Sequence, residues 1–144
     1  MIHSIVQRPV DAIISLTSTS NGIGGQFQVV ATTEAAQVDI FFAHAPVNSS
    51  LMLDAHTSRS LATVKLHETY EGKFCLTTTL LKPDVLIDED VEDPSGKQRE
   101  RIVDIERVGR GDLVGNVWWG KEEEGTERGV VNIKTTFSPA RLRL

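Results

Sequence analysis

The sequence predicts an all-β fold, and three observations support this fold class. Val and Ile together number 25, against 12 Leu and 9 Ala, and there are 13 Thr. Branching at Cβ costs rotamer freedom in a helix but packs well on a pleated sheet. Apolar and polar residues also alternate along much of the chain. Finally, no segment of 11 or more residues carries a convincing helical stripe of apolar side chains.

The alternation places the expected strands along the chain. Each such segment directs its apolar side chains to one face, because successive side chains of a strand point to opposite faces of a sheet. In chain order the segments are 27–31, 38–40, 51–55, 64–66, 74–78, 85–87, 101–108, 113–119 and 131–133. The chain has 144 residues and 15.8 kDa, which suits one domain.

We therefore expect a single all-β domain over residues 1–144. Within it, residues 1–9 are expected to be an N-terminal extension. Residues 88–100 and 121–129 are strongly charged and are expected to be exposed polar loops. The first of these loops contains Pro94, Ser95 and Gly96, which indicate a turn.

Four segments share one pattern of residue spacing. Starting from Phe27, Leu53, Phe74 or Val131, apolar residues recur at offsets of 2, 11 and 13, and small residues or Thr occupy offsets 4 and 5. A weaker copy begins at Ile14. Each copy reads as a strand, a Thr/Ser-rich corner and a second strand. Two architectures fit this unit: a β-solenoid-like stack of repeats and an antiparallel β-sandwich.

Three further segments carry a resemblance to a known family. They are His67–Phe74 (HETYEGKF), Val91–Lys97 (VEDPSGK) and Gly115–Gly120 (GNVWWG). Together they resemble signature pieces of an uncharacterised fungal domain family with adhesin-like, Thr/Ser-rich β-repeats, over about residues 10–144. The resemblance implies a β-repeat architecture and a fungal origin. It carries over no catalytic residue, and the corners of this chain, such as Thr57-Ser58-Arg59, depart from the family's pattern.

Composition and charge exclude several function classes. A net charge of -5 and a pI near 5.3 argue against nucleic acid as a partner. The longest apolar run is four residues, 40–43, so membrane insertion is not expected. The start of the chain lacks the plan of a secretion signal, which favours the cytoplasm by default. Cys75 is the one cysteine, and it is expected to be a packing residue rather than a catalytic thiol.

Neither a cofactor nor a strong metal site is expected. Asp88, Asp90 and Glu92 have the spacing that opens an EF-hand loop, but Asp93 stands where that loop needs Gly. These three carboxylates are therefore only weak metal candidates, and a solvated edge is the favoured interpretation. A hydrolase would need a carboxylate pair, and no spacing selects one from the candidates Glu71, Asp84, Asp88 and Asp112.

The aromatic residues support the best binding hypothesis. Trp118 and Trp119 are adjacent in a strand, so one faces the core and the other is presented outward beside Asn116. With Tyr70 and His67, Trp118 and Asn116 could form a surface for a sugar ring. We therefore expect a non-enzymatic, adhesin-like interaction or structural module, with a lectin-like carbohydrate-binding protein as the alternative and a hydrolase as a remote one. Its partner would be a glycan or another protein, and open sheet edges would allow a homo-oligomer.

Overall fold

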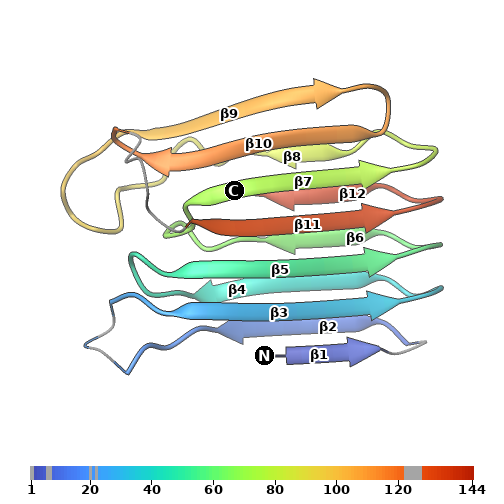
Figure 1. Ribbon diagram of the computed structural model, residues 1–144, viewed down its shortest axis with the longest axis horizontal. Helices are drawn as coiled ribbons and strands as arrows, with labels where there is room; N and C mark the ends of the chain where they lie inside the picture. Colours follow the sequence, from blue (N-terminus) through green and yellow to red (C-terminus); the bar gives the residue numbers. More distant parts are fainter. Residues whose placement is uncertain (1, 6–7, 20, 22, 122–127) are drawn as a thin grey trace.

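A computed structural model describes residues 2–5, 8–19, 21, 23–121 and 128–144, and it is all-β (Figure 1). These residues form twelve strands and no helix. They therefore contain no helix that could span a membrane. The strands are β1 (Ile2–Ile5), β2 (Val10–Ser15), β3 (Gln26–Thr33), β4 (Val38–His44), β5 (Ser50–Thr57), β6 (Ala62–Lys65), β7 (Gly72–Thr78), β8 (Asp84–Leu86), β9 (Arg101–Val108), β10 (Asp112–Trp119), β11 (Gly129–Thr135) and β12 (Ala140–Arg143).

The strands form two sheets in a sandwich-like arrangement (Figure 1). The seven-stranded sheet has the order β1-β3-β5-β11-β7-β10-β9, and the five-stranded sheet has the order β2-β4-β6-β12-β8. From β1 to β8, the chain alternates between the two sheets at every strand. Neighbouring repeat units therefore pair in parallel, and the antiparallel pairs are β7–β10 and β10–β9.

The last two strands lie in the middle of the stack. Strand β11 is inserted between β5 and β7, and β12 is inserted between β6 and β8. The backbone N–H of Leu144 donates to the carbonyl of Leu86 at 2.8 Å, and that of Leu66 donates to Arg143 at 3.0 Å. This order leaves β8 at the edge of the five-stranded sheet, next to the β9–β10 hairpin.

The repeat units share one buried interior. Leu53, Val131 and Phe74 are direct register partners on β5, β11 and β7, as their common offset predicts. All three are buried. The first unit differs from the prediction, because Val29 rather than Phe27 is the partner of Leu53. Phe27 lies two residues earlier, where it is partly buried.

The corners are marked by a ladder of buried threonines. Thr33, Thr57, Thr78 and Thr135 are register partners across β3, β5, β7 and β11. Each hydroxyl donates to a carbonyl of a corner: Thr33 and Thr57 both donate to Ala36, Thr78 to Leu81 and Thr135 to Ser138. These bonds satisfy corner carbonyls that no strand pairs.

Three features of the fold differ from the sequence predictions. Residues 2–5 form β1, which pairs with β3, where an N-terminal extension was expected. Ile14 is the register partner of Phe42 on a second strand, so it does not begin a repeat. Ile87, expected in the core, is 42% exposed because it follows the edge strand β8. Residues 88–100 lie between β8 and β9, whereas residues 122–127 of the other expected loop lie outside the described residues.

Candidate functional site

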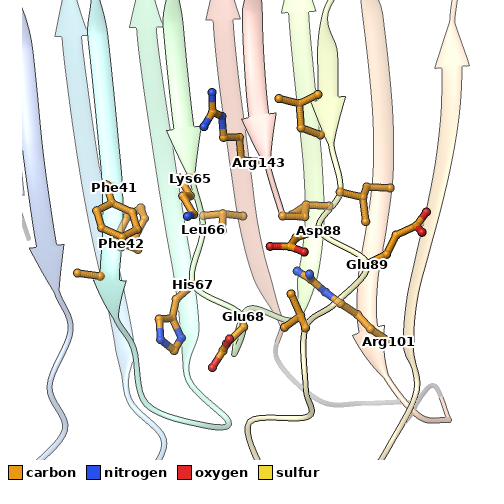
Figure 2. Close-up of a pocket in the computed structure, with 15 residues that line it drawn as sticks. Phe41, Phe42, Lys65, Leu66, His67, Glu68, Asp88, Glu89, Arg101 and Arg143 are labelled. Atoms are coloured by element: carbon orange, nitrogen blue, oxygen red, sulfur yellow. The ribbon is translucent and has the colours of Figure 1, made fainter.

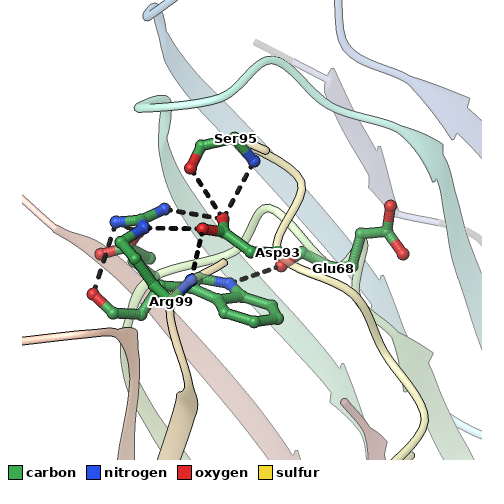
Figure 3. A network of polar contacts seen from close by, with 6 residues as sticks. Glu68, Asp93, Ser95 and Arg99 are labelled. Carbon is green, nitrogen blue, oxygen red and sulfur yellow. Dashed lines mark hydrogen bonds and ion pairs between the residues drawn. The ribbon is translucent and has the colours of Figure 1, made fainter. Parts of the chain in front are cut away.

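The loop 88–100 is held in place by a buried carboxylate. Asp93 accepts hydrogen bonds from the backbone N–H and hydroxyl of Ser95 at 3.0 and 2.8 Å. It also accepts from Arg99, whose backbone N–H, Nε and Nη2 lie 3.0, 3.1 and 3.1 Å away (Figure 3). The Arg99 side chain holds the pKa of Asp93 well below its usual range, against the opposing effect of desolvation. This arrangement is called the Asp93 clasp below.

The clasp joins the three segments on which the family resemblance rests. Arg99 Nη1 lies 3.5 Å from Glu71 Oε1 and 3.4 Å from the carbonyl oxygen of Trp119. The indole Nε1 of Trp119 donates to the carbonyl of Glu68 at 3.0 Å (Figure 3). Residues from 67–74, 91–97 and 115–120 thus meet at one end of the sheets.

Beside the clasp, a groove of about 620 Å³ crosses the outer face of the five-stranded sheet (Figure 2). Its apolar side chains include Phe41, Leu86, Ile87 and Val91. Its charged side chains include Lys65, Arg143, Asp88 and Glu89. The loop 88–100 forms one wall, so the clasp determines the shape of that wall.

Register explains why these side chains share one face. Phe41 pairs with Lys65, Lys65 with Arg143, and Arg143 with Leu86, so the four form one row across β4, β6, β12 and β8. Lys65 Nζ lies 5.1 Å from the centre of the Phe41 ring, within cation–π distance. The row is apolar at its two ends and positively charged in the middle.

Arg101, at the end of the groove, was not among the predicted site residues. Its Nε, Nη1 and Nη2 atoms are buried, and no described residue forms a hydrogen bond with them. The guanidinium carbon lies 5.8 Å from the centre of the Trp119 ring. Burial lowers the pKa of Arg101, while the charges of Asp88 and Glu68 act in the opposite direction. Buried guanidinium groups without partners are costly, so this residue is a candidate for ligand contact.

The two tryptophans point to opposite faces, as predicted. Trp119 and Val117 are buried, whereas Trp118 and Asn116 are half-buried on the outer face of β10. Asn116 is the register partner of Asp104 on β9 and of Lys73 on β7. Trp118 therefore lies on the seven-stranded sheet and does not line the groove.

The other two residues of the predicted sugar surface lie elsewhere. Tyr70 is 5% exposed, and its hydroxyl donates to the carbonyl of Lys73 at 2.5 Å. Burial raises the pKa of Tyr70, and its ring cannot stack on a ligand from solvent. His67 lines the groove, with Nδ1 2.9 Å from the hydroxyl of Thr69, and burial lowers its pKa. The four residues thus do not form one surface.

The acidic candidates are also dispersed. Asp88, Asp90 and Glu92 are exposed, and among the described residues no group of three His, Cys, Asp or Glu side chains is placed to hold a metal ion. Of the carboxylates considered for a hydrolase, Asp88 lines the groove. Glu71 pairs with Arg99, Asp84 with Arg141 at 3.6 Å, and Asp112 lies on β10.

Comparison with known proteins adds no relative: no protein-family model, curated protein or solved structure matches this chain. The groove is therefore the candidate functional site. The sequence signal for it is the alternation in β4, β6 and β12, which sends Phe41, Lys65 and Arg143 to the face opposite the core.

Proposed function

We propose that this chain is a non-enzymatic, solenoid-like β-repeat interaction module of the adhesin type, and that it binds its partner in the groove of the five-stranded sheet. The fungal, adhesin-like resemblance is part of this proposal. The parallel, in-register pairing of its repeat units supports the solenoid-like description.

The observation that carries the proposal is the row of Phe41, Lys65, Arg143 and Leu86 across four strands. An exposed aromatic ring, two cations and an aliphatic side chain share one face, with Asp88 and Glu89 beside them (Figure 2). Concave surfaces that combine apolar area with a few convergent polar groups are typical of binding sites. Because these residues stand on paired strands, the spacing of their Cα atoms is fixed.

The experiment probes peptide and glycan arrays with the labelled wild-type protein, Arg143→Ala and Arg59→Ala. Arg59 is exposed at a corner and is therefore a matched control for loss of one positive charge. The proposal predicts array ligands whose binding falls at least about tenfold in Arg143→Ala and is unchanged in Arg59→Ala. Binding that Arg143→Ala leaves intact contradicts it.

Carbohydrate binding by the seven-stranded sheet is the second candidate function. It is favoured by Trp118 and Asn116, which share the outer face of β10, with Lys73 and Asp104 as the register partners of Asn116. An indole beside an amide and a carboxylate offers both a stacking surface and hydrogen-bonding groups for a sugar. Glycan binding that Trp118→Ala removes and Arg143→Ala leaves unchanged would favour this alternative.

A further inference from the structure

The two sheets end at different levels on one side of the molecule. The seven-stranded sheet continues past β7 through β10 to β9, whereas the five-stranded sheet stops at β8 (Figure 1). On β9, the register partners of the buried residues of β10 are Arg101, Val103, Ile105 and Arg107. Ile105 is 37% exposed and Val103 only partly buried, because no strand of the second sheet covers them.

Strand β8 presents an open edge toward this uncovered area. Its one strand partner among the described residues is β12. The carbonyl of Leu86 and the N–H of Asp88 are both bonded to Leu144, on the β12 side. Since backbone groups alternate in direction along a strand, those of Val85 and Ile87 point to the open side. Leu86 and Ile87 are 43% and 42% exposed at this edge.

Two arginines, Arg101 and Arg107, lie near the open edge. The guanidinium of Arg101 is buried without a hydrogen-bond partner among the described residues, as noted above. Arg107 Nη1 lies 3.4 Å from the carbonyl of Pro83, just before β8. Asp88 and Glu68 compensate the charge of Arg101 through space but do not bond to it. A carboxylate is the group that matches a guanidinium in both charge and geometry.

We propose that β8 accepts an extended, acidic segment of a partner protein as a sixth strand of the five-stranded sheet. Its backbone would bond to Val85 and Ile87, its apolar side chains would contact Ile87 and Ile105, and a carboxylate would pair with Arg101. Strand addition of this kind draws affinity from main-chain hydrogen bonds and specificity from alternate side chains. To reach this carboxylate, the Arg101 side chain would have to rotate away from the Trp119 ring. This inference rests on the proposed function and names the class of partner.

A second copy of the chain fits this edge less well. Strand β2 is the other edge of the five-stranded sheet, and β1 lies beside it in the other sheet. If β2 of a second copy paired with β8, the β1 strand of that copy would have to pair with β7 of the first copy. That position is already occupied by β10 of the first copy. A single strand meets no such obstacle, so the uneven ends of the sheets favour a lone extended segment.

The test uses a synthetic seven-residue peptide in which valine alternates with glutamate, blocked at both ends. It is titrated into the ¹⁵N-labelled protein, and affinity and backbone amide shifts are followed by NMR. The inference predicts saturable shifts at Val85 and Ile87 and at least tenfold weaker binding to Arg101→Met, with Arg59→Met unchanged. Two further peptides carry N-methyl groups, one on the odd-numbered amides and the other on the even-numbered amides. Both keep the side chains, but each loses the hydrogen bonds on one side of the strand. The inference predicts that one of these two peptides loses binding.

The opposite results overturn the inference. They are no saturable binding at millimolar peptide, equal binding of both N-methylated peptides, or equal affinity for Arg101→Met and the wild type. The N-methylated peptides leave the protein unchanged, so this arm holds even where Arg101→Met does not fold. If the peptide fails while an array ligand still depends on Arg143, strand addition is wrong and the proposed function stands. If array ligands bind Arg143→Ala as well as they bind the wild type, the proposed function itself is wrong.

Discussion

Asp93 and Arg99 form a two-point ion pair, with Nε 3.1 Å from Oδ2 and Nη2 3.1 Å from Oδ1. The Asp93 side chain is 2% exposed and that of Arg99 26%. The pair closes the segment of five residues between them, and Arg99 links this segment to Glu71 and Trp119. The wall of the groove thus depends on one carboxylate in a loop that sequence analysis treats as solvated.

Asp93→Ala is expected to lower the free energy of unfolding by about 1–2 kcal/mol at pH 7, because the change removes charge-assisted hydrogen bonds to Arg99, whose partial exposure lets solvent screen the pair. Urea unfolding measures the loss, and Asp90→Ala, in the same loop, is the matched control. A loss in Asp93→Ala no greater than that in the control would contradict the clasp.

The same carboxylate makes stability depend on pH. Since the pKa of Asp93 is lowered in the folded protein, its contribution is fully present above the ordinary carboxyl pKa and is lost as the pH falls through the lower, folded value. The wild type is therefore expected to lose more stability in acid than Asp93→Asn, which has no carboxyl group to protonate. Urea midpoints between pH 7 and pH 3 check this, and parallel curves for the two proteins would contradict it.

Gly72 permits the close approach of β7 and β11. It has φ +153°, and a Cβ there would lie 2.1 Å from the carbonyl oxygen of Gly129. Gly72→Ala is expected to cost about 3 kcal/mol or more, because backbone atoms must move apart. Gly96, with φ +70° and open space around it, is the control, and Gly96→Ala should cost about 1 kcal/mol. Equal thermal shifts for the two variants would contradict this account.

The threonine ladder is tested by an isosteric change. Thr57→Val keeps the buried shape but removes the hydroxyl that donates to the carbonyl of Ala36, 2.9 Å away in the neighbouring unit. The expected loss of stability is about 1 kcal/mol, the usual net value of one hydrogen bond. Thr63→Val, on the outer face of β6, should change stability by less than about 0.5 kcal/mol in the same chemical unfolding assay. A smaller effect at Thr57 than at Thr63 would be inconsistent with the ladder.

Arg101→Met is expected to leave stability unchanged or to raise it by about 1 kcal/mol. The change replaces a buried, unpartnered guanidinium with an apolar side chain of similar length, so a desolvation cost disappears. Differential scanning calorimetry compares it with Arg99→Met, which loses the clasp and should be less stable. A marked fall in the melting temperature of Arg101→Met would mean that Arg101 serves the fold rather than a ligand.

The buried rows could be predicted because alternation is a local property. Val131, Phe74 and Leu53 belong to one face of their strands whichever strands lie beside them. The opposite orientations of Trp118 and Trp119 follow from the same geometry. The burial of Tyr70 could not be predicted in this way, because Tyr70 follows a turn outside the strands, where no periodicity applies.

The order of the strands could not be predicted. Leu53, Phe74 and Val131 are interchangeable apolar partners, so alternation does not say that β11 separates β5 from β7. The first register is wrong by two residues for a similar reason, since Phe27 and Val29 lie on the same face. Arg101 was missed because a charged residue at the start of a strand is normally solvated. The antiparallel register of β9 and β10 places it beside Trp119.

The position of the C-terminal strand pair in the middle of the stack is the central claim, because it leaves β8 at the open edge. Cys75 on β7 is the register partner of Asn132 on β11, and Asn132 is the partner of Asp54 on β5. Adjacent strands lie about 4.8 Å apart, which a disulfide can bridge, and strands two positions apart do not meet this limit. The most direct measurement oxidises Asn132→Cys and Asp54→Cys and identifies intramolecular disulfides by mass spectrometry. The account predicts a disulfide to Cys75 in Asn132→Cys and none in Asp54→Cys; a disulfide in Asp54→Cys alone would place β5 beside β7 and contradict it.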